Sequence, residues 1–175
     1  MNYLLNFIFL VLALSLFNGC ATIQPPQLPV DASDLRFKNC TGPTVNNLRE
    51  GKWLCKNNKG ITTFEGVFAA GRKHGLVRLW REDGSLDTES HWENGNLEGL
   101  LTDYFPNGRK YLEATYRQQT PDGVMTEWFE NGNKKSELNY LKGTLNGWVR
   151  EWNENGELKS EEFYQNGQLL TPDSK

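Results

Sequence analysis

The sequence predicts an all-β protein, an elongated antiparallel meander of stacked 24-residue β-hairpins. Three observations lead to this fold class. Glycines recur at a constant step of 24 residues, aromatic residues recur every 12, and Asn-Gly or Asp-Gly pairs separate short segments of mixed polar and apolar residues. Twelve residues accommodate one short strand and one turn, so 24 residues make one hairpin, and about ten strands are expected.

The glycine repeat is carried by three sets of positions. The first set is Gly51, Gly75, Gly99, Gly123 and Gly147. The second set is Gly60, Gly84, Gly108, Gly132 and Gly156, and the third is Gly71, Gly95, Gly143 and Gly167, with Gln119 as the exception. Asn-Gly and Asp-Gly supply the positive φ that tight hairpin turns require, so most of these glycines are expected in turns. Side-chain alternation does not run cleanly from strand to strand, which indicates β-bulges at glycines.

Aromatic residues form the strongest track of the repeat. They are Phe68, Trp80, Trp92, Tyr104, Tyr116, Trp128, Tyr140, Trp152 and Tyr164. Only 37% of the residues are hydrophobic, so aromatic side chains must supply much of the buried apolar area. We interpret this series as a structural ladder, with Trp80, Trp128 and Trp152 in the core.

The first 19 residues differ from the rest of the chain. Residues 1–19 hold no Lys, Arg, Asp or Glu, and an apolar run spans Leu4 to Phe17. A membrane-spanning helix needs about 20 apolar residues, so the run is typical of a secretory signal peptide. It ends in "LFNGC", which resembles the lipobox of bacterial lipoproteins and implies a lipid on Cys20. An uncleaved anchor and a soluble secreted product are the alternatives.

Residues 20–50 are expected to hold the lipidated cysteine, a Pro-rich tether and a cap segment. The stretch "ATIQPPQLPVDASD" contains three prolines, which favour an extended spacer. In lipoproteins of Gram-negative type, Ala after the Cys resembles an outer-membrane sorting signal. The predicted location is therefore the bacterial cell envelope, at the outer membrane and facing the periplasm.

Two cysteines remain if Cys20 carries lipid. Cys40 and Cys55 would then be an even pair in an oxidising compartment. A bridge would close a loop of about 15 residues and contribute roughly 3 kcal/mol in the loop-entropy account. We expect this disulfide, with two independent thiols as the alternative. His74 and His91 stand at no ligand spacing with these cysteines, so no metal or other cofactor is expected.

The repeat carries a family resemblance. "GVMTEWFENGNKKSELNYLKGTLNG" resembles the bacterial variant of the MORN (membrane occupation and recognition nexus) repeat, and the resemblance covers residues 51–167. The expected units are 51–74, which is degenerate, 75–98, 99–122, 123–146 and 147–167, followed by a C-terminal tail, 168–175. The resemblance implies a twisted sheet of stacked hairpins. Such repeats occur in scaffolds, in membrane-associated proteins and in a group labelled YwqK-type antitoxins.

Enzymatic and nucleic-acid-binding functions are disfavoured. The chain has no G-x-S-x-G, no paired catalytic Cys and His, and no Gly-rich loop that leads into a helix. A net charge of −3 and a pI near 5.5 argue against nucleic acid, which requires a basic surface. Glutamates also recur in the repeat, at Glu65, Glu89, Glu113, Glu137 and Glu161. A residue that recurs at one structural position is interpreted as structural, paired with nearby Lys or with turn amides.

Binding is the remaining class. We expect a membrane-anchored, non-catalytic interaction module or scaffold that docks an envelope protein. The candidate binding face comprises Trp148, Trp92, Arg78 and Arg150, because Trp and Arg dominate binding energies at interfaces. Trp148 lies outside the twelve-residue ladder and is the best candidate for exposure. Two alternatives stay open: an immunity or antitoxin-like protein that neutralises a cognate toxin, and a glycan or peptidoglycan binder.

Overall fold

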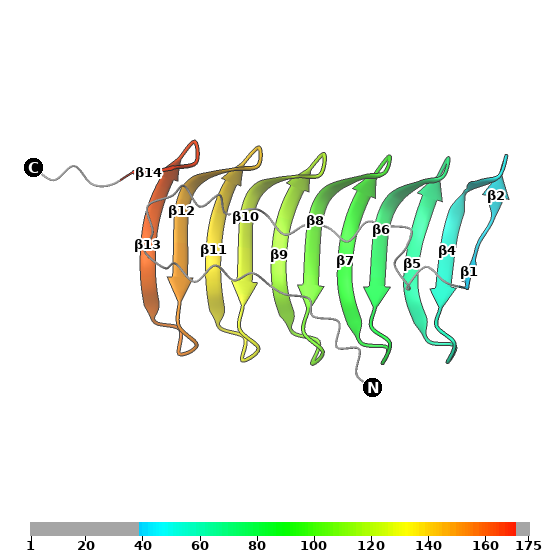
Figure 1. The fold of residues 1–175 in the computed structure, drawn as a ribbon, viewed down its shortest axis with the longest axis horizontal. Coiled ribbons are helices and arrows are strands. Elements are labelled where there is room, and N and C mark those ends of the chain that lie inside the picture. The colour runs from blue at the N-terminus through cyan, green and yellow to red at the C-terminus, as the bar shows by residue number, and fades with distance from the viewer. Residues whose placement is uncertain (1–38, 171–175) are drawn as a thin grey trace, which may run out of the picture.

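The protein is one long antiparallel sheet, as a computed structural model shows for residues 39–170 (Figure 1). The expected signal peptide, Cys20, most of the tether and residues 171–175 lie outside the described residues. Twelve strands follow one another in the order β1-β4-β5-β6-β7-β8-β9-β10-β11-β12-β13-β14, and β2 pairs with β3 in a separate hairpin. The predicted fold class, an all-β antiparallel meander, is confirmed.

Ten longer strands, β4 to β13, form the body of the sheet, as expected, and short strands flank it. The bounds are β1 Cys40–Thr41, β2 Thr44–Val45, β3 Leu48–Arg49, β4 Gly51–Lys56, β5 Thr62–Ala69, β6 Arg72–Trp80, β7 Leu86–Glu93, β8 Asn96–Tyr104, β9 Lys110–Arg117, β10 Thr120–Trp128, β11 Lys134–Leu141, β12 Thr144–Trp152, β13 Leu158–Gln165 and β14 Gln168–Leu169. The expected tail at 168–175 therefore begins with a strand, because Gln168 and Leu169 pair with β13.

Two kinds of turn alternate along the sheet. One kind is a two-residue loop in which both residues have positive φ, as at Asn94 (51°) and Gly95 (86°). Gln118 and Gln119 adopt the same conformation, with φ of 47° and 66°, so the one missing glycine leaves the turn type unchanged. These values are those of the tight hairpin turns that match the twist of flanking strands.

The other turn kind has a three-residue loop and uses its acidic or amide residue differently. In the turn after β6, the Arg81 amide donates to the Ser85 carbonyl at 2.9 Å, and only Gly84 has positive φ. Asp83 does not supply positive φ, contrary to expectation. Its carboxylate instead accepts a hydrogen bond from the Ser85 amide at 2.8 Å, which closes an Asx turn.

The glycines inside strands mark bulges. Opposite Gly99, Ser90 pairs with Leu101 and Trp92 with Leu97, so the single residue His91 faces three residues of β8. Gly99 has a φ of 91°, which only glycine adopts without strain. Equivalent shifts occur opposite Gly75, Gly123 and Gly147. The bulges expected at glycines are therefore present at Gly75, Gly99, Gly123 and Gly147. Each lies in the pairing of the glycine's strand with the strand before it.

The register divides the sheet into two faces. One face, called here the core face, carries the buried hydrophobic cluster: Cys55, Phe64, Phe68, Val77, Leu79, Trp92, Leu97, Leu101, Leu112, Ala114, Tyr116, Met125, Tyr140, Leu145 and Val149. The opposite face, called here the Glu face, carries the repeated glutamates. One end of the core is closed covalently, because Cys40 of β1 and Cys55 of β4 form a disulfide.

Candidate functional site: an exposed aromatic patch on the Glu face

A continuous row of polar side chains crosses the Glu face. Successive strand pairings place the following residues opposite one another, from β5 to β13: Glu65, Arg78, Glu89, Thr102, Glu113, Thr126, Glu137, Arg150 and Glu161. Every second strand therefore supplies a glutamate, and the strands between supply Arg or Thr. Cross-strand neighbours of opposite charge stabilise a sheet, so this row contributes to strand pairing.

Each of the five glutamates has a cationic partner. The Glu65 carboxylate lies 2.8 Å from Lys52, and Lys110 pairs with Glu113. Glu89 accepts a hydrogen bond from Arg78 at 2.7 Å and another from the Tyr104 hydroxyl at 2.9 Å. The hydrogen bond from Arg78 lowers the pKa of Glu89, although burial opposes the shift. The repeated glutamate is thus part of an ion-pair row.

An exposed apolar stripe runs beside the Glu row on the same face. Its exposed hydrophobic members are Val67, Leu100, Val124, Trp148 and Phe163. Trp148 is 40% exposed and Phe163 is 37% exposed. His91, Thr115 and Asn139 occupy the same row on the intervening strands, and the two large aromatic residues meet at its C-terminal end, on β12 and β13.

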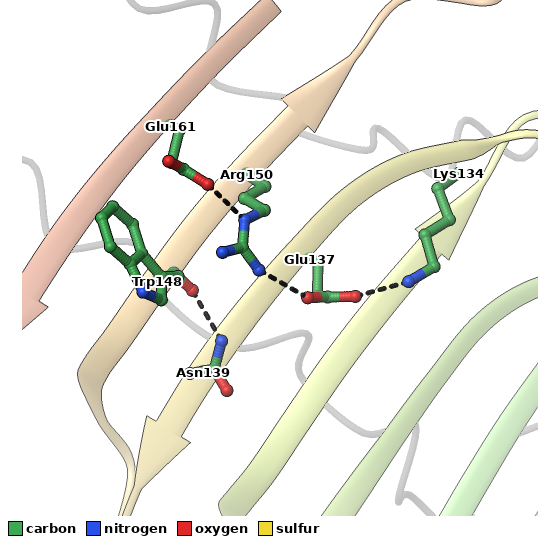
Figure 2. A network of polar contacts seen from close by, with 6 residues as sticks. All are labelled: Lys134, Glu137, Asn139, Trp148, Arg150 and Glu161. Carbon is green, nitrogen blue, oxygen red and sulfur yellow. Dashed lines mark hydrogen bonds and ion pairs between the residues drawn. The ribbon is translucent and has the colours of Figure 1, made fainter. Parts of the chain in front are cut away.

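Trp148 and Phe163 form an aromatic pair. Their rings lie 5.1 Å apart at an interplanar angle of 73°, in edge-to-face contact. Figure 2 shows the polar network beside Trp148. The guanidinium of Arg150 lies 5.4 Å from the Trp148 ring centroid. We call Trp148, Phe163 and Arg150 the Trp148 patch.

Polar neighbours hold Arg150 and the backbone of Trp148 in place. Arg150 donates to Glu161 at 2.5 Å and to Glu137 at 3.4 Å, and Lys134 approaches the other oxygen of Glu137 at 2.6 Å. The Asn139 amide donates to the Trp148 carbonyl at 2.7 Å. The hydrogen bond to Glu161 raises the pKa of Arg150, so the guanidinium remains charged at any physiological pH. The patch is therefore a fixed cation beside two exposed rings.

The candidate residues from the sequence fall in different places. Trp148 and Arg150 lie together in the patch, whereas Arg78 lies on β6, bonded to Glu89. Trp92 is only 7% exposed, on the core face, and its indole N–H donates to the Ser90 hydroxyl at 2.8 Å. Its assignment to a binding face is wrong, because β7 turns this side chain toward the core cluster.

The ladder also divides differently from the prediction. Trp80, Trp128 and Trp152 are half-buried at strand ends and do not belong to the buried cluster, so their placement in the core is wrong. The lysines of the ion-pair row cover two of them: Lys110 lies 5.8 Å from the Trp128 ring centroid, and Lys134 lies 5.8 Å from that of Trp152. These two indole rings therefore contact lysines that also pair with glutamates of the Glu row.

Sequence reasoning missed Phe163. It occupies the position that His91, Thr115 and Asn139 hold in earlier units, and it pairs directly with Trp148 in the register of β12 and β13. An aromatic residue that departs from the 12-residue series, next to another such departure, is the signal that could have identified it.

The comparison with known families agrees with this geometry. Residues 121–142 and 145–166 each match the family described as MORN repeat variant. The chain contains two MORN repeats of this variant. The two matched MORN repeats are the hairpins β10–β11 and β12–β13, and the second contains the Trp148 patch. The same strand glycines, bulges and glutamate row continue back through β5, so the MORN geometry extends beyond the matched residues. No curated protein matches the chain.

Two further observations concern other kinds of site. Within residues 39–170, no group of three or more His, Cys, Asp or Glu side chains is arranged to hold a metal ion. The same range contains no helix long and apolar enough to cross a membrane.

Proposed function

We propose that this MORN repeat protein is a non-catalytic interaction module that binds a protein partner of the bacterial cell envelope through the Trp148 patch. The observation that carries the proposal is the exposed Trp148–Phe163 pair on the face opposite the core. Neither ring is needed to fill the core cluster, and exposed aromatic residues beside an arginine are the composition of interface hot spots. The fixed guanidinium of Arg150 adds a directional donor to the apolar contact.

The proposal includes a lipid on Cys20 and a position facing the periplasm. Its support is the sequence "LFNGC" after a short apolar run, which resembles a lipobox. A lipid anchor would restrict the possible partners to proteins of the cell envelope. Cys20→Ala should release the protein from the membrane fraction and abolish labelling with a fatty-acid analogue. Persistent labelling of that variant would place the lipid elsewhere and contradict the anchor.

A photo-crosslinking amino acid in place of Phe163 tests the partner site. The matched control position is His91, which occupies the same place three units earlier and is also exposed. We expect a defined adduct with one envelope protein from position 163, abolished by Trp148→Ala, and none from position 91. Equal adducts from both positions would show that the patch is not the binding site.

The identity of the crosslinked protein also distinguishes the two protein-binding hypotheses. A toxin as the partner would support the immunity-like alternative. A glycan is the second candidate ligand, since exposed indole rings with adjacent polar groups also suit sugar faces. Sedimentation with purified murein sacculi tests it directly. Co-sedimentation that Trp148→Ala abolishes would favour the glycan and argue against a protein partner.

A further inference from the structure

The outer edge of β13 is unpaired over most of its length among the described strands. β14 pairs with Tyr164 and Gln165, and the Leu170 amide donates to the Phe163 carbonyl at 2.8 Å. Backbone groups of an antiparallel strand point alternately to its two edges. The N–H and C=O of Glu161 therefore point to the same outer edge as those of Phe163, and no described strand pairs with them.

β14 repeats the way in which β12 begins. Leu169 pairs with Tyr164 as Leu145 pairs with Tyr140. β12 continues along β11 well beyond this pair, whereas the paired residues of β14 end there. The edge from Leu158 to Glu162 is therefore equivalent to the edge of β11 that β12 covers.

Two adjacent carboxylates lie at this edge, one on each face. In the Glu row, Glu137 has neighbours on both sides, whereas Glu161 has Arg150 on one side alone among the described residues. Glu162 lies on the core face, where it accepts a hydrogen bond from the Tyr164 hydroxyl at 2.8 Å. No described Lys or Arg pairs with Glu162. Both carboxylates can therefore accept a cation from an added strand.

The edge is acidic. Residues 153–165 hold four glutamates and one lysine, a net charge of −3. Opposite charges on directly opposed residues stabilise strand pairing, so a basic segment suits this edge. A second copy of β13 suits it poorly, because a symmetric antiparallel pairing centred on Glu161 or Glu162 places like charges directly opposite one another.

The turn before β13 presents a donor toward the same side. In the preceding unit, Asn131 donates its side-chain amide to the Glu154 carbonyl of the next hairpin at 2.8 Å. Asn155 holds the equivalent position in the last turn, and its side-chain amide bonds to no described acceptor. A strand added in the direction of β12 would bring the carbonyls that follow it to this amide.

We propose that β13 is a docking edge for an extended segment of a partner protein, which adds to the sheet as an antiparallel strand and carries two adjacent basic residues. One basic residue pairs with Glu162 on the core face and the next with Glu161 on the Glu face. Strand addition of this kind draws affinity from backbone hydrogen bonds and specificity from alternate side chains. The inference rests on the proposed function, because the added strand lies beside the Trp148 patch, and it specifies the chemistry of the partner.

Short peptides test the proposal on the full chain. The basic probe is Lys-Arg-Thr-Val-Thr with blocked ends, and the acidic control is Glu-Glu-Thr-Val-Thr. A third probe is the basic peptide with methylated backbone amides, which keeps the charge but cannot pair as a strand. At a concentration equal to its Kd, the basic probe should slow hydrogen exchange of the Glu161 amide about twofold, because only the free form exchanges. The acidic and methylated peptides should leave this exchange unchanged.

Charge reversal provides the matched comparison. Glu161→Lys with Glu162→Lys should abolish the effect of the basic peptide and create one with the acidic peptide. Glu154→Lys with Glu157→Lys changes the net charge equally in the adjoining turn and should keep the response to the basic peptide. Equal protection by the methylated peptide, or loss of the response in both double variants, would show attraction by net charge alone and overturn the proposal.

Slow exchange of the Glu161 amide in the chain without peptide would also overturn the proposal, because the edge would then be paired already, by a second copy or by another part of the chain. The result is separable from the test of the proposed function. An adduct from position 163 with no protection of Glu161 would retain the Trp148 patch and reject the added strand. Protection of Glu161 with no adduct from position 163 would do the reverse.

Discussion

The two end strands of the sheet are stabilised by different contacts. At the N-terminal end, a disulfide joins β1 to β4, and the Trp53 indole N–H donates to the Pro43 carbonyl at 3.0 Å. The guanidinium of Arg49 also lies 4.7 Å from the Trp53 ring centroid. At the C-terminal end, the two-residue β14 pairs only with Tyr164 and Gln165. The remainder of β13 pairs with β12 alone among the described strands.

This difference places the proposed binding patch at the less constrained end of the sheet. In an array where each hairpin contacts only its neighbours, stability is a sum of unit and interface terms, so the ends decide which strands open first. The N-terminal end is closed by a covalent bond and an indole. The Trp148 patch lies on β12 and β13, beside the less protected end, where small rearrangements of the strands cost least.

The largest effect should come from the middle of the aromatic row on the core face, which contains Trp92, Tyr116 and Tyr140. Tyr116→Ala removes a ring that strands on both sides enclose, and such truncations cost about 3–5 kcal/mol. Tyr164 holds the same position on β13, half-buried and flanked by one long strand, so Tyr164→Ala should cost clearly less. Chemical denaturation measures both. Equal costs would show that the C-terminal end is as well packed as the middle.

Removing the covalent closure should have the next largest effect. Cys40→Ser with Cys55→Ser opens a 15-residue loop, and the loss should be about 3 kcal/mol. Amide hydrogen exchange should then rise in β4 and β5 but stay unchanged in β12 and β13. Unchanged exchange in β4 would mean that the remaining contacts close this end without the disulfide.

The indole cap should contribute less. Trp53→Phe keeps an aromatic ring beside Phe68, with which Trp53 makes an edge contact at 6.2 Å, but removes the donor to Pro43. A loss of about 1 kcal/mol is expected for one such hydrogen bond. Thermal unfolding provides the measurement, with Trp80→Phe as a control of similar size and burial. If Trp53→Phe leaves the stability unchanged, ring packing and not the hydrogen bond to Pro43 stabilises this end.

The smallest effect concerns pH. The folded-state pKa of Glu89 lies below its ordinary value because Arg78 hydrogen-bonds to the carboxylate. Its contribution is therefore present above the unfolded pKa of about 4.3 and is lost as the pH falls through the lower folded value. Glu89→Gln should cost about 0.5–1 kcal/mol at pH 7 and progressively less below pH 4. A cost independent of pH would exclude the ion pair as its source.

Much of the fold could be predicted because its period is local. One step of 24 residues contains two strands and two turns whose Gly and Asn residues identify them. The division of the ladder could not be predicted from that period. Trp80, Tyr104, Trp128 and Trp152 each follow a core-face residue directly and so point to the Glu face. The strand that pairs with each of them contains one extra residue, Asp87, Tyr111, Lys135 or Lys159, which shifts the register there. The aromatic residues therefore alternate between faces, and Trp92 belongs with the core.

The candidate site required the register across all strands. Glu137, Arg150 and Glu161 are far apart in sequence and become neighbours only when the bulges are placed. Trp148 was identifiable because it departs from the series at a position where other units have Leu or Val. Phe163 departs in the same way, but its contact with Trp148 depends on the pairing of β12 with β13.

The disulfide between Cys40 and Cys55 also determines how the sheet would bear a mechanical load. Tension applied through the chain before Cys40 crosses the sulfur–sulfur bond into β4, so the intervening loop carries none of it. β4 is paired with β5 from Gly51 to Lys56, and these hydrogen bonds share the force. Without the bond, the same tension would peel the two-residue β1 from the edge one pair at a time.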